Sequence, residues 1–175
     1  MDFDLIIIGA GPAGLSLARA LRGSGLHIGL IEQHTRDALQ QPAFDGREIA
    51  LTQHSAELLR QLGIWPLLGE AHIAPLRDAL VLDGGAGPGQ QRMRISHQLS
   101  PKSELGFLVA NHHIRRAAFE AALAAEDASG QPPELRCGEQ VTQIHTDASG
   151  AHLTLASGQR LSAQLVVAAD SRHSG

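Results

Sequence analysis

The feature that most constrains the fold of this 175-residue chain is a glycine-rich turn that directly follows a short apolar run. Residues 2–8 read DFDLIII, a pattern that favours a buried strand, and residues 9–14 have the spacing G-x-G-x-x-G. Residues 12–22 then predict a helix with proline in its first turn, and residues 27–31 predict a second strand. A strand, a helix and a second strand in this order form a right-handed crossover between parallel strands, so we expect a βαβ unit at the N-terminus.

Each glycine of the turn has its own physical role in such a unit. Gly9 permits the tight turn out of the strand, Gly11 lets a pyrophosphate approach the backbone, and Gly14 allows the helix to pack closely on the strand. The first turn of the helix, with Pro12 and Ala13, presents unpaired N–H groups and a partial positive charge. All five residues are therefore candidates for binding a dinucleotide.

Glu32 comes eighteen residues after Gly14, at the predicted end of the second strand. A carboxylate at this position accepts hydrogen bonds from both hydroxyls of an adenosine ribose, and it repels a 2′-phosphate. It therefore disfavours NADP as a tightly held cofactor. We add Glu32 and the adjacent Gln33 to the candidate binding residues, which on their own leave NAD and FAD equally open.

The remainder of the chain predicts further helices and strands around polar connections. Residues 33–46 are polar and predict a long loop. Helices are expected at 52–62 and at 111–127, where Asn111 is a candidate N-cap, and strands at 79–82, 92–99 and 107–110, with a glycine-rich turn at 84–89. A small antiparallel meander is expected from 135–137, 140–145, 151–155 and 160–161, before a last buried strand at 165–169.

Composition excludes several classes of function. The net charge of −4 argues against nucleic-acid binding, which requires a basic face. No apolar run approaches the roughly 20 residues of a membrane-spanning helix, and acidic residues occupy the place of the basic start of a signal peptide. The single cysteine, Cys137, forms no internal disulfide, so we expect a reducing, cytoplasmic location.

The ten histidines do not predict a metal site. They are scattered and lack the spacing of known zinc motifs. His112 and His113 are adjacent at the start of a predicted helix, where we expect neighbouring side chains to point in different directions. We therefore predict no metal-binding residue.

Three further segments carry a family resemblance. Residues 44–52 read FDGREIALT and precede LGIW at 62–65, residues 108–111 read LVAN, and residues 165–174 read LVVAADSRHS. In this order and spacing they resemble the flavoprotein aromatic hydroxylases, which are FAD-dependent monooxygenases of the para-hydroxybenzoate hydroxylase type. The resemblance is closest to the branch that hydroxylates rings during ubiquinone biosynthesis.

The resemblance implies a role for three more residues. Arg47 matches an arginine near the flavin and its pyrophosphate, Asn111 lies at the strand-to-helix corner that touches the ADP moiety, and Asp170 matches an aspartate on the pyrophosphate side. These matches favour FAD over NAD as the dinucleotide. The chain departs from the family pattern at Ser171, where glycine is usual.

The resemblance also implies a fold and a division into domains. We expect an α/β fold with a Rossmann-like FAD-binding βαβ domain and a parallel sheet, a small antiparallel β-meander, and part of a β-rich substrate domain. Residues 1–74 would form the FAD-binding unit and its following helices, residues 75–110 part of the substrate domain, and residues 111–175 a return to the FAD-binding domain. The family's third flavin motif, a Gly-Asp pair, has no match here. We therefore expect an N-terminal fragment that is inactive on its own.

The activity implied by the resemblance is oxygen insertion into an aromatic ring. In that family NAD(P)H reduces FAD, and the reduced flavin reacts with O₂ to form a C4a-hydroperoxide that transfers one oxygen atom. Because the cofactor carries this chemistry, no catalytic side chain is predicted. The expected substrate is a small aromatic compound. A polyprenylated one would bring the protein to the surface of the inner membrane or to other biosynthetic enzymes.

Two other functions stay open at this point. The chain could belong to another FAD-dependent oxidoreductase, such as a prenyl reductase or a halogenase. A halogenase would need a catalytic lysine, and Lys102 is the only lysine in the sequence. Alternatively, the chain could be a nucleotide-binding fragment without turnover.

Overall fold

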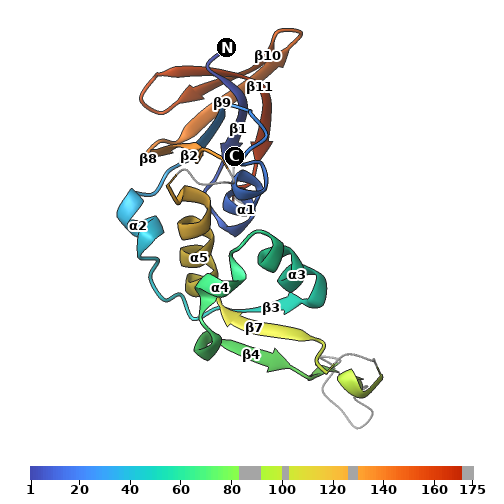
Figure 1. Cartoon of the computed structure of the whole chain (residues 1–175). Helices are drawn as coiled ribbons and strands as arrows, with labels where there is room; N and C mark the ends of the chain where they lie inside the picture. Colours follow the sequence, from blue (N-terminus) through green and yellow to red (C-terminus); the bar gives the residue numbers. More distant parts are fainter. Residues whose placement is uncertain (83–91, 100–102, 126–129, 171–175) are drawn as a thin grey trace.

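The structure, a computed structural model, describes residues 1–82, 92–99, 103–125 and 130–170 (Figure 1). The predicted turn at 84–89, Lys102 and Ser171 lie outside the described residues. The larger sheet has six strands in the order β8-β2-β1-β11-β10-β9. Their bounds are β1 Phe3–Ile8, β2 Ile28–Glu32, β8 Glu134–Cys137, β9 Val141–Asp147, β10 Gly150–Leu155 and β11 Arg160–Ala168.

Three of the five strand pairings in this sheet are parallel, and the other two form an antiparallel meander. β1 lies between β2 and β11 and is parallel to both, with Leu5 opposite Ile28 on one side and Leu165 on the other. β8 extends the parallel part beyond β2, whereas β10 is antiparallel to both of its neighbours, β9 and β11. This arrangement confirms the predicted α/β fold with its βαβ unit and its meander.

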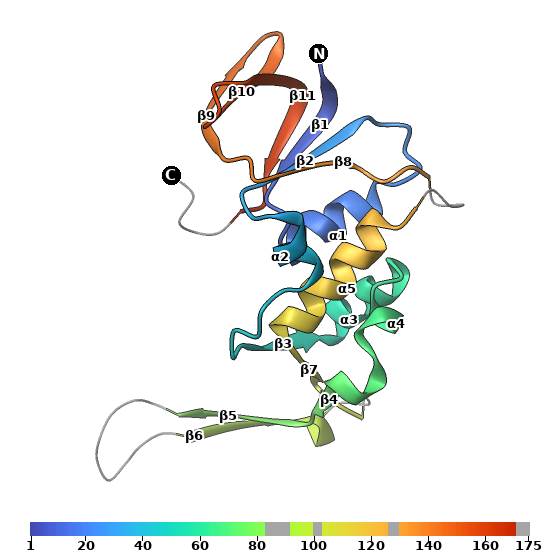
Figure 2. The ribbon, with the colours of Figure 1, turned by 90° about the vertical axis from the view of Figure 1, so that its left-hand side faces the viewer.

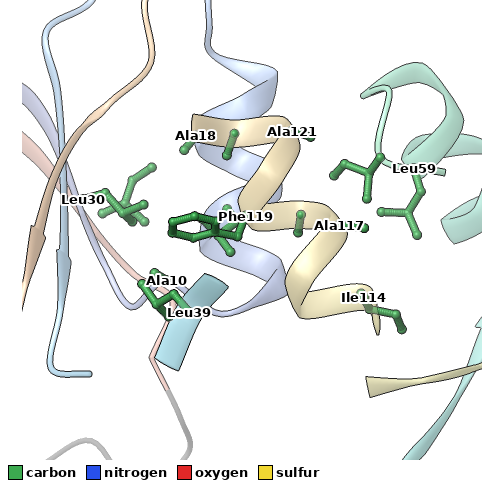
Figure 3. Packing of buried hydrophobic residues seen from close by; sticks show 14 of the residues in the cluster. Ala10, Ala18, Leu30, Leu39, Leu59, Ile114, Ala117, Phe119 and Ala121 are labelled. Atoms are coloured by element: carbon green, nitrogen blue, oxygen red, sulfur yellow. The ribbon is translucent and has the colours of Figure 1, made fainter. Parts of the chain in front are cut away.

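Two helices cover the parallel part of the sheet, namely α1 (Pro12–Ala20) and α5 (Asn111–Leu123). They pack against each other within one buried cluster that is rich in small residues, among them Ala18 of α1 and Ala121 of α5 (Figure 3). Phe119 of α5 points from this crossing toward Leu30 of β2 (Figure 3). The buried cluster that results holds the first βαβ unit and α5 together, and its apolar burial is the main stabilising contribution.

A second, smaller β region lies beyond the N-terminal end of α5. Its sheet has the order β3-β7-β4 and is antiparallel, while a separate hairpin projects from the body of the molecule (Figure 2). The bounds are β3 Glu48–Thr52, β4 Ile73–Leu76 and β7 Gly106–Ala110, with hairpin strands β5 Asp78–Leu82 and β6 Arg92–Ser96. The helices of this region are α3 Gln53–Gln61 and α4 Trp65–Leu68, with short 3₁₀ turns at Glu70–His72 and His97–Leu99.

Several expectations about the elements are wrong, among them the burial of the last strand, whose Leu165 is exposed. The segment 33–46 is not all loop, because it contains α2 (Arg36–Gln40), capped by Thr35, whose side chain accepts a hydrogen bond from the Ala38 N–H. The strand at 135–137 is not part of the meander but is β8, parallel to β2. The two strands expected at 160–161 and 165–169 are one, β11. Asn111 is the first residue of α5, and the N-cap position belongs to Ala110.

These errors share a physical cause. A four-residue strand such as β8 has no periodicity that distinguishes a parallel neighbour from an antiparallel one, and its partner is set by where α5 returns the chain. β3, β4 and α4 were not expected at all. Each of these three elements is only four or five residues long. Their conformations depend on contacts with β7 and α5.

Candidate nucleotide-binding site

The turn after β1 is shaped by two glycines that the protein itself requires. Gly9 has φ of +99°, and a Cβ there would lie 2.8 Å from the Asp170 nitrogen. At Gly14 a Cβ would lie 2.0 Å from the carbonyl oxygen of Gly9, a distance that no folded backbone tolerates. Gly9 therefore lets the ends of β1 and β11 meet, and Gly14 lets α1 begin directly against the turn.

Gly11 differs from Gly9 and Gly14 because none of the described residues crowds it. Within the part of the chain that the structure describes, a Cβ at Gly11 would meet no atom within 4 Å. Gly11 is also the N-cap of α1, and Pro12 is the first residue of the helix. Gly11 offers no side-chain cap, and the first turn of α1 contains no acidic residue that would compete with an anion for the helix N-terminus. Open space in front of free N–H groups fits an anionic pyrophosphate.

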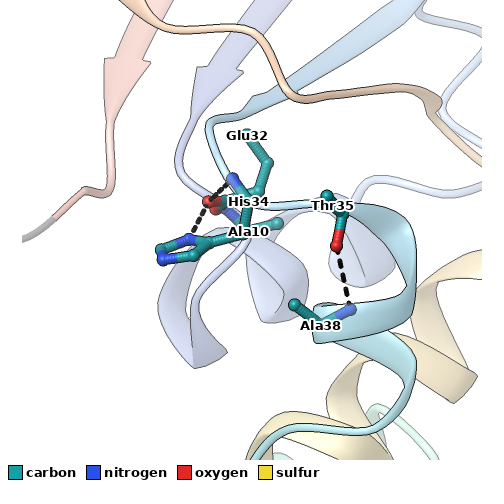
Figure 4. Close-up of polar contacts among 5 residues, drawn as sticks. All are labelled: Ala10, Glu32, His34, Thr35 and Ala38. Carbon is teal, nitrogen blue, oxygen red and sulfur yellow. Dashed lines mark hydrogen bonds and ion pairs between the residues drawn. The ribbon is translucent and has the colours of Figure 1, made fainter.

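Glu32 closes the same edge of the sheet from β2. The Glu32 side chain is buried. Its Oε2 accepts a hydrogen bond from the Ala10 N–H at 2.7 Å, and its Oε1 accepts one from the His34 N–H at 2.9 Å (Figure 4). The His34 ring nitrogen Nδ1 lies 2.6 Å from Oε1. Burial by itself raises the pKa of Glu32, but the hydrogen bonds outweigh it and hold the pKa below its ordinary value. The carboxylate is therefore ionised at neutral pH and still has acceptor capacity for ribose hydroxyls.

The strand order brings the candidates of the N-terminus and the C-terminus to one edge. β2, β1 and β11 are adjacent and parallel, so their carboxyl ends lie side by side. Gln33 follows β2 and Asp170 follows β11, and both residues are exposed. We call this group the nucleotide edge: Gly9, Gly11, Pro12, Ala13, Gly14, Glu32, Gln33 and Asp170. The carboxyl edge of a parallel sheet is where α/β folds bind nucleotides.

The two remaining candidates lie together at the start of α5. The Asn111 N–H donates to the carbonyl oxygen of Arg47 at 2.9 Å, and the Asn111 side chain donates to Asp45 Oδ2 at 2.7 Å. Arg47 binds the same oxygen through Nε at 2.8 Å. We call Asp45, Arg47 and Asn111 the arginine corner. The structure thus places the ten predicted residues in two groups, the nucleotide edge and the arginine corner.

The family is decided by comparison with known proteins. The family described as FAD binding domain matches residues 2–175. This chain belongs to the FAD binding domain family. We therefore take FAD, and not NAD, as the dinucleotide of its βαβ unit.

Named relatives of this FAD binding domain include two hydroxylases. It is 41% identical over 175 residues to the ubiquinone hydroxylase UbiM of Neisseria meningitidis, an alignment that covers 98% of this chain and 36% of that protein. It is 31% identical over 171 residues to the ubiquinone hydroxylase UbiL of Rhodospirillum rubrum, covering 98% of this chain and 38% of that protein. The chain thus spans just over a third of the length of these relatives.

Solved structures show the same fold. The flavin-dependent monooxygenase PieE, determined in complex with FAD and substrate, aligns with a TM-score of 0.70 at 24% identity, covering 99% of this chain and 31% of that one. FqzB aligns with a TM-score of 0.74 at 20% identity, covering 98% of this chain and 36% of that one. At these identities the likeness concerns the fold of the FAD binding domain.

Sequence reasoning missed two residues of this FAD binding domain, Asp45 and His34. Asp45 joins Arg47 to Asn111, and His34 contacts Glu32. Each stands two positions from a predicted binding residue. That spacing is a weak signal, because it acquires meaning only when the segment from β2 to β3 is folded onto α5.

The histidines at the start of α5 do not point apart as expected. The rings of His112 and His113 lie 4.0 Å apart, His113 stacks on His72 at 3.8 Å, and Phe44 meets His112 edge-on. Burial and then the neighbouring His112 lower the pKa of His113. Among the described residues no group of three or more His, Cys, Asp or Glu side chains is arranged to hold a metal ion. None of the described helices combines the length and the apolar content needed to cross a membrane.

Proposed function

We propose that this chain is the FAD-binding part of an NAD(P)H-dependent monooxygenase that hydroxylates an aromatic ring in ubiquinone biosynthesis. The observation that carries the proposal is the likeness to two named ubiquinone hydroxylases over 98% of this chain. The match to the FAD binding domain family supports the cofactor. The division into residues 1–74, 75–110 and 111–175 is part of the proposal.

The described residues fit the two ends of the ADP moiety. Glu32 would accept hydrogen bonds from the ribose, and the backbone at Gly11 and the N-terminus of α1 would hold the pyrophosphate. Arg47 and Asn111 would contact the dinucleotide from the arginine corner, and Asp170 from the end of β11. Pro12, Ala13 and Gln33 complete the proposed contacts.

The bound FAD would supply the redox and oxygen chemistry, with NAD(P)H as reductant and O₂ as oxidant. The role of this chain is to bind and orient the dinucleotide, and we assign it no catalytic side chain. We propose a small aromatic substrate, and a polyprenylated one would require contact with a membrane surface or with another enzyme of the pathway.

A second proposal concerns the 175-residue chain by itself. It corresponds to just over a third of the length of the named hydroxylases. We therefore expect the isolated chain to bind FAD weakly through its ADP end and not to hydroxylate.

Two measurements on the enzyme that contains this chain test the proposal. The purified enzyme should show the visible absorbance of bound flavin, and a preparation that cannot be loaded with FAD would contradict the proposal. Incubation with NADH or NADPH, O₂ and a polyprenylated phenol should give a hydroxylated ring. A saturated prenyl chain would identify a reductase, and a halogenated ring formed with added halide would identify a halogenase.

A further inference from the structure

Asp45 lies in the segment that runs from β2 to β3 and folds back onto α5. The antiparallel pairing of β3 with β7 sets Glu48 opposite Ala110, so the residues that flank this pair, Arg47 and Asn111, become neighbours. The backbone bond from Asn111 to Arg47 continues this ladder by one step. Backbone pairing therefore brings the two residues together, but it leaves the direction of the arginine side chain open.

The Asp45 carboxylate accepts four hydrogen bonds at this point. Oδ2 accepts from Arg47 Nε at 2.8 Å, from Arg47 Nη2 at 2.5 Å and from Asn111 Nδ2 at 2.7 Å. Oδ1 accepts from the Arg47 backbone N–H at 3.1 Å. The Asp45 carboxylate thus holds both the main chain and the guanidinium of Arg47, and it ties them to Asn111, which is 66 positions from Asp45. Charge-assisted bonds of this kind define the orientation of an arginine more strictly than a single contact does.

The protein leaves much of the guanidinium available to a ligand. The Arg47 side chain is 65% exposed, whereas the Asp45 side chain is 27% exposed and Asn111 is buried. The bonds to the Asp45 side chain use two of the five N–H donors of the guanidinium. The hydrogen bonds from Arg47 and then from Asn111 hold the pKa of Asp45 well below its ordinary value, so the carboxylate stays ionised at neutral pH.

We propose that Asp45 is a positioning residue for FAD, which acts by fixing the orientation of Arg47 and Asn111 and not by touching the dinucleotide. This inference rests on the proposed function, in which these two residues contact FAD. Two effects oppose each other, because Asp45 also offsets part of the positive charge that attracts the pyrophosphate. Orientation dominates, since a long exposed arginine loses much side-chain entropy on binding unless it is ordered beforehand.

A double-mutant cycle on FAD affinity tests the inference. The dissociation constant of FAD is measured by titration for the wild-type chain, Asp45→Ala, Arg47→Ala and the double variant. We expect Asp45→Ala to weaken binding about tenfold, the cost of ordering one long side chain. The double variant should lose less affinity than the two single losses added together, because Asp45 acts largely through Arg47. Asp45→Asn, which keeps one acceptor oxygen, should fall between wild type and Asp45→Ala.

The matched control is Asp78→Asn, which removes the same charge from an arginine pair with Arg94 on the hairpin. It should bind FAD as the wild type does. A ligand-free measurement completes the test: the Arg47 Nε–H signal in proton–nitrogen NMR spectra should be protected from exchange in the wild type and in Asp78→Asn. In Asp45→Ala this protection should be lost.

The outcomes separate the two proposals. If Asp45→Ala binds FAD as tightly as the wild type, or if its loss adds fully to that of Arg47→Ala, the inference is overturned while the proposed function stands. An Arg47 Nε–H that is equally protected in Asp45→Ala also overturns it. If no FAD binding is measurable even for the wild type and the longer enzyme, the proposed function fails and the inference fails with it.

Discussion

The nucleotide edge and the arginine corner are built on different principles. At the nucleotide edge the essential groups are backbone atoms and one buried carboxylate, and most lie within the first βαβ unit. At the arginine corner they are side chains, two of them at the surface, contributed by segments on either side of the second β region. The first group is set by steric fit and the second by charge.

This difference predicts how each group responds to substitution. Atoms of the nucleotide edge also pack the protein, as the close approach of Gly14 to the Gly9 carbonyl shows. A change there therefore affects folding as well as binding. Exposed ion pairs like that of Arg47 with Asp45 contribute little to stability, so a change of the Arg47 side chain should affect binding almost alone.

The largest effect is expected for Gly14→Ala. Its Cβ would lie 2.0 Å from the Gly9 oxygen, so α1 or the turn must shift. We expect the free energy of unfolding to fall by about 3 kcal/mol or more, at the upper end of overpacking effects. Urea denaturation followed by circular dichroism measures this loss. Gly11→Ala is the control and should unfold close to the wild-type midpoint, because its Cβ meets no atom of the described residues. Equal unfolding midpoints for the wild type, Gly14→Ala and Gly11→Ala would show that residues of the nucleotide edge do not pack the protein.

Glu32→Gln should produce the next largest effect, and it should depend on pH. The hydrogen bonds of Glu32 place its pKa in the folded state below the ordinary value of 4.5. The stability they contribute is therefore fully present above 4.5 and is lost as the pH falls through the folded-state pKa. At pH 7 the variant should lose about 2 kcal/mol, because bonds to a charged acceptor are replaced. In denaturation experiments from pH 7 to about 3, the difference in the free energy of unfolding between wild type and variant should become smaller as the pH falls. If the difference in the free energy of unfolding between Glu32→Gln and the wild type did not change with pH, the loss would come from the shape of the side chain and not from its charge.

Gly11→Ala isolates binding from folding at the nucleotide edge. The open space around Gly11 lets the protein accept a methyl group, but a pyrophosphate could no longer approach the backbone. We expect FAD affinity to fall about tenfold or more, the equivalent of one lost hydrogen bond to a charged group, with the melting temperature unchanged. Isothermal titration with FAD measures it. Unchanged affinity would show that the phosphates do not lie in front of Gly11.

The two groups also differ in how far sequence alone could predict them. The glycine spacing and Glu32 predicted the part of the nucleotide edge in the first βαβ unit, because strand, turn and helix follow one another within thirty-two residues and local geometry determines the outcome. Asp170 was named only by the resemblance. At the arginine corner, the resemblance named Arg47 and Asn111 but not the residue that joins them. Asp45 meets Asn111 only through the pairing of β3 with β7, and neither β3 nor α2 was expected.

The topology of the sheet shows the same limit. The strands β1 and β2 and the second half of β11 were expected from apolar runs, yet nothing local indicated that β8 would lie beside β2 in parallel. Its position follows from α5, which carries the chain across the sheet after the second β region. Long-range pairing of this kind depends on tertiary packing, which no residue pattern within β8 records.

The smallest predicted effect concerns α2, the short helix that links the two groups. The Thr35 hydroxyl caps α2 by accepting a hydrogen bond from the Ala38 N–H at 3.3 Å (Figure 4), and Leu39 anchors the helix in the core. Thr35→Ala should lower the free energy of unfolding by about 0.5 to 1 kcal/mol. Thr35→Ser, which keeps the hydroxyl, should restore most of it. Because Leu39 still holds α2 in place, FAD affinity should not change. A loss of affinity in Thr35→Ala alone would show that α2 couples the nucleotide edge to the arginine corner, and that the two groups are not independent.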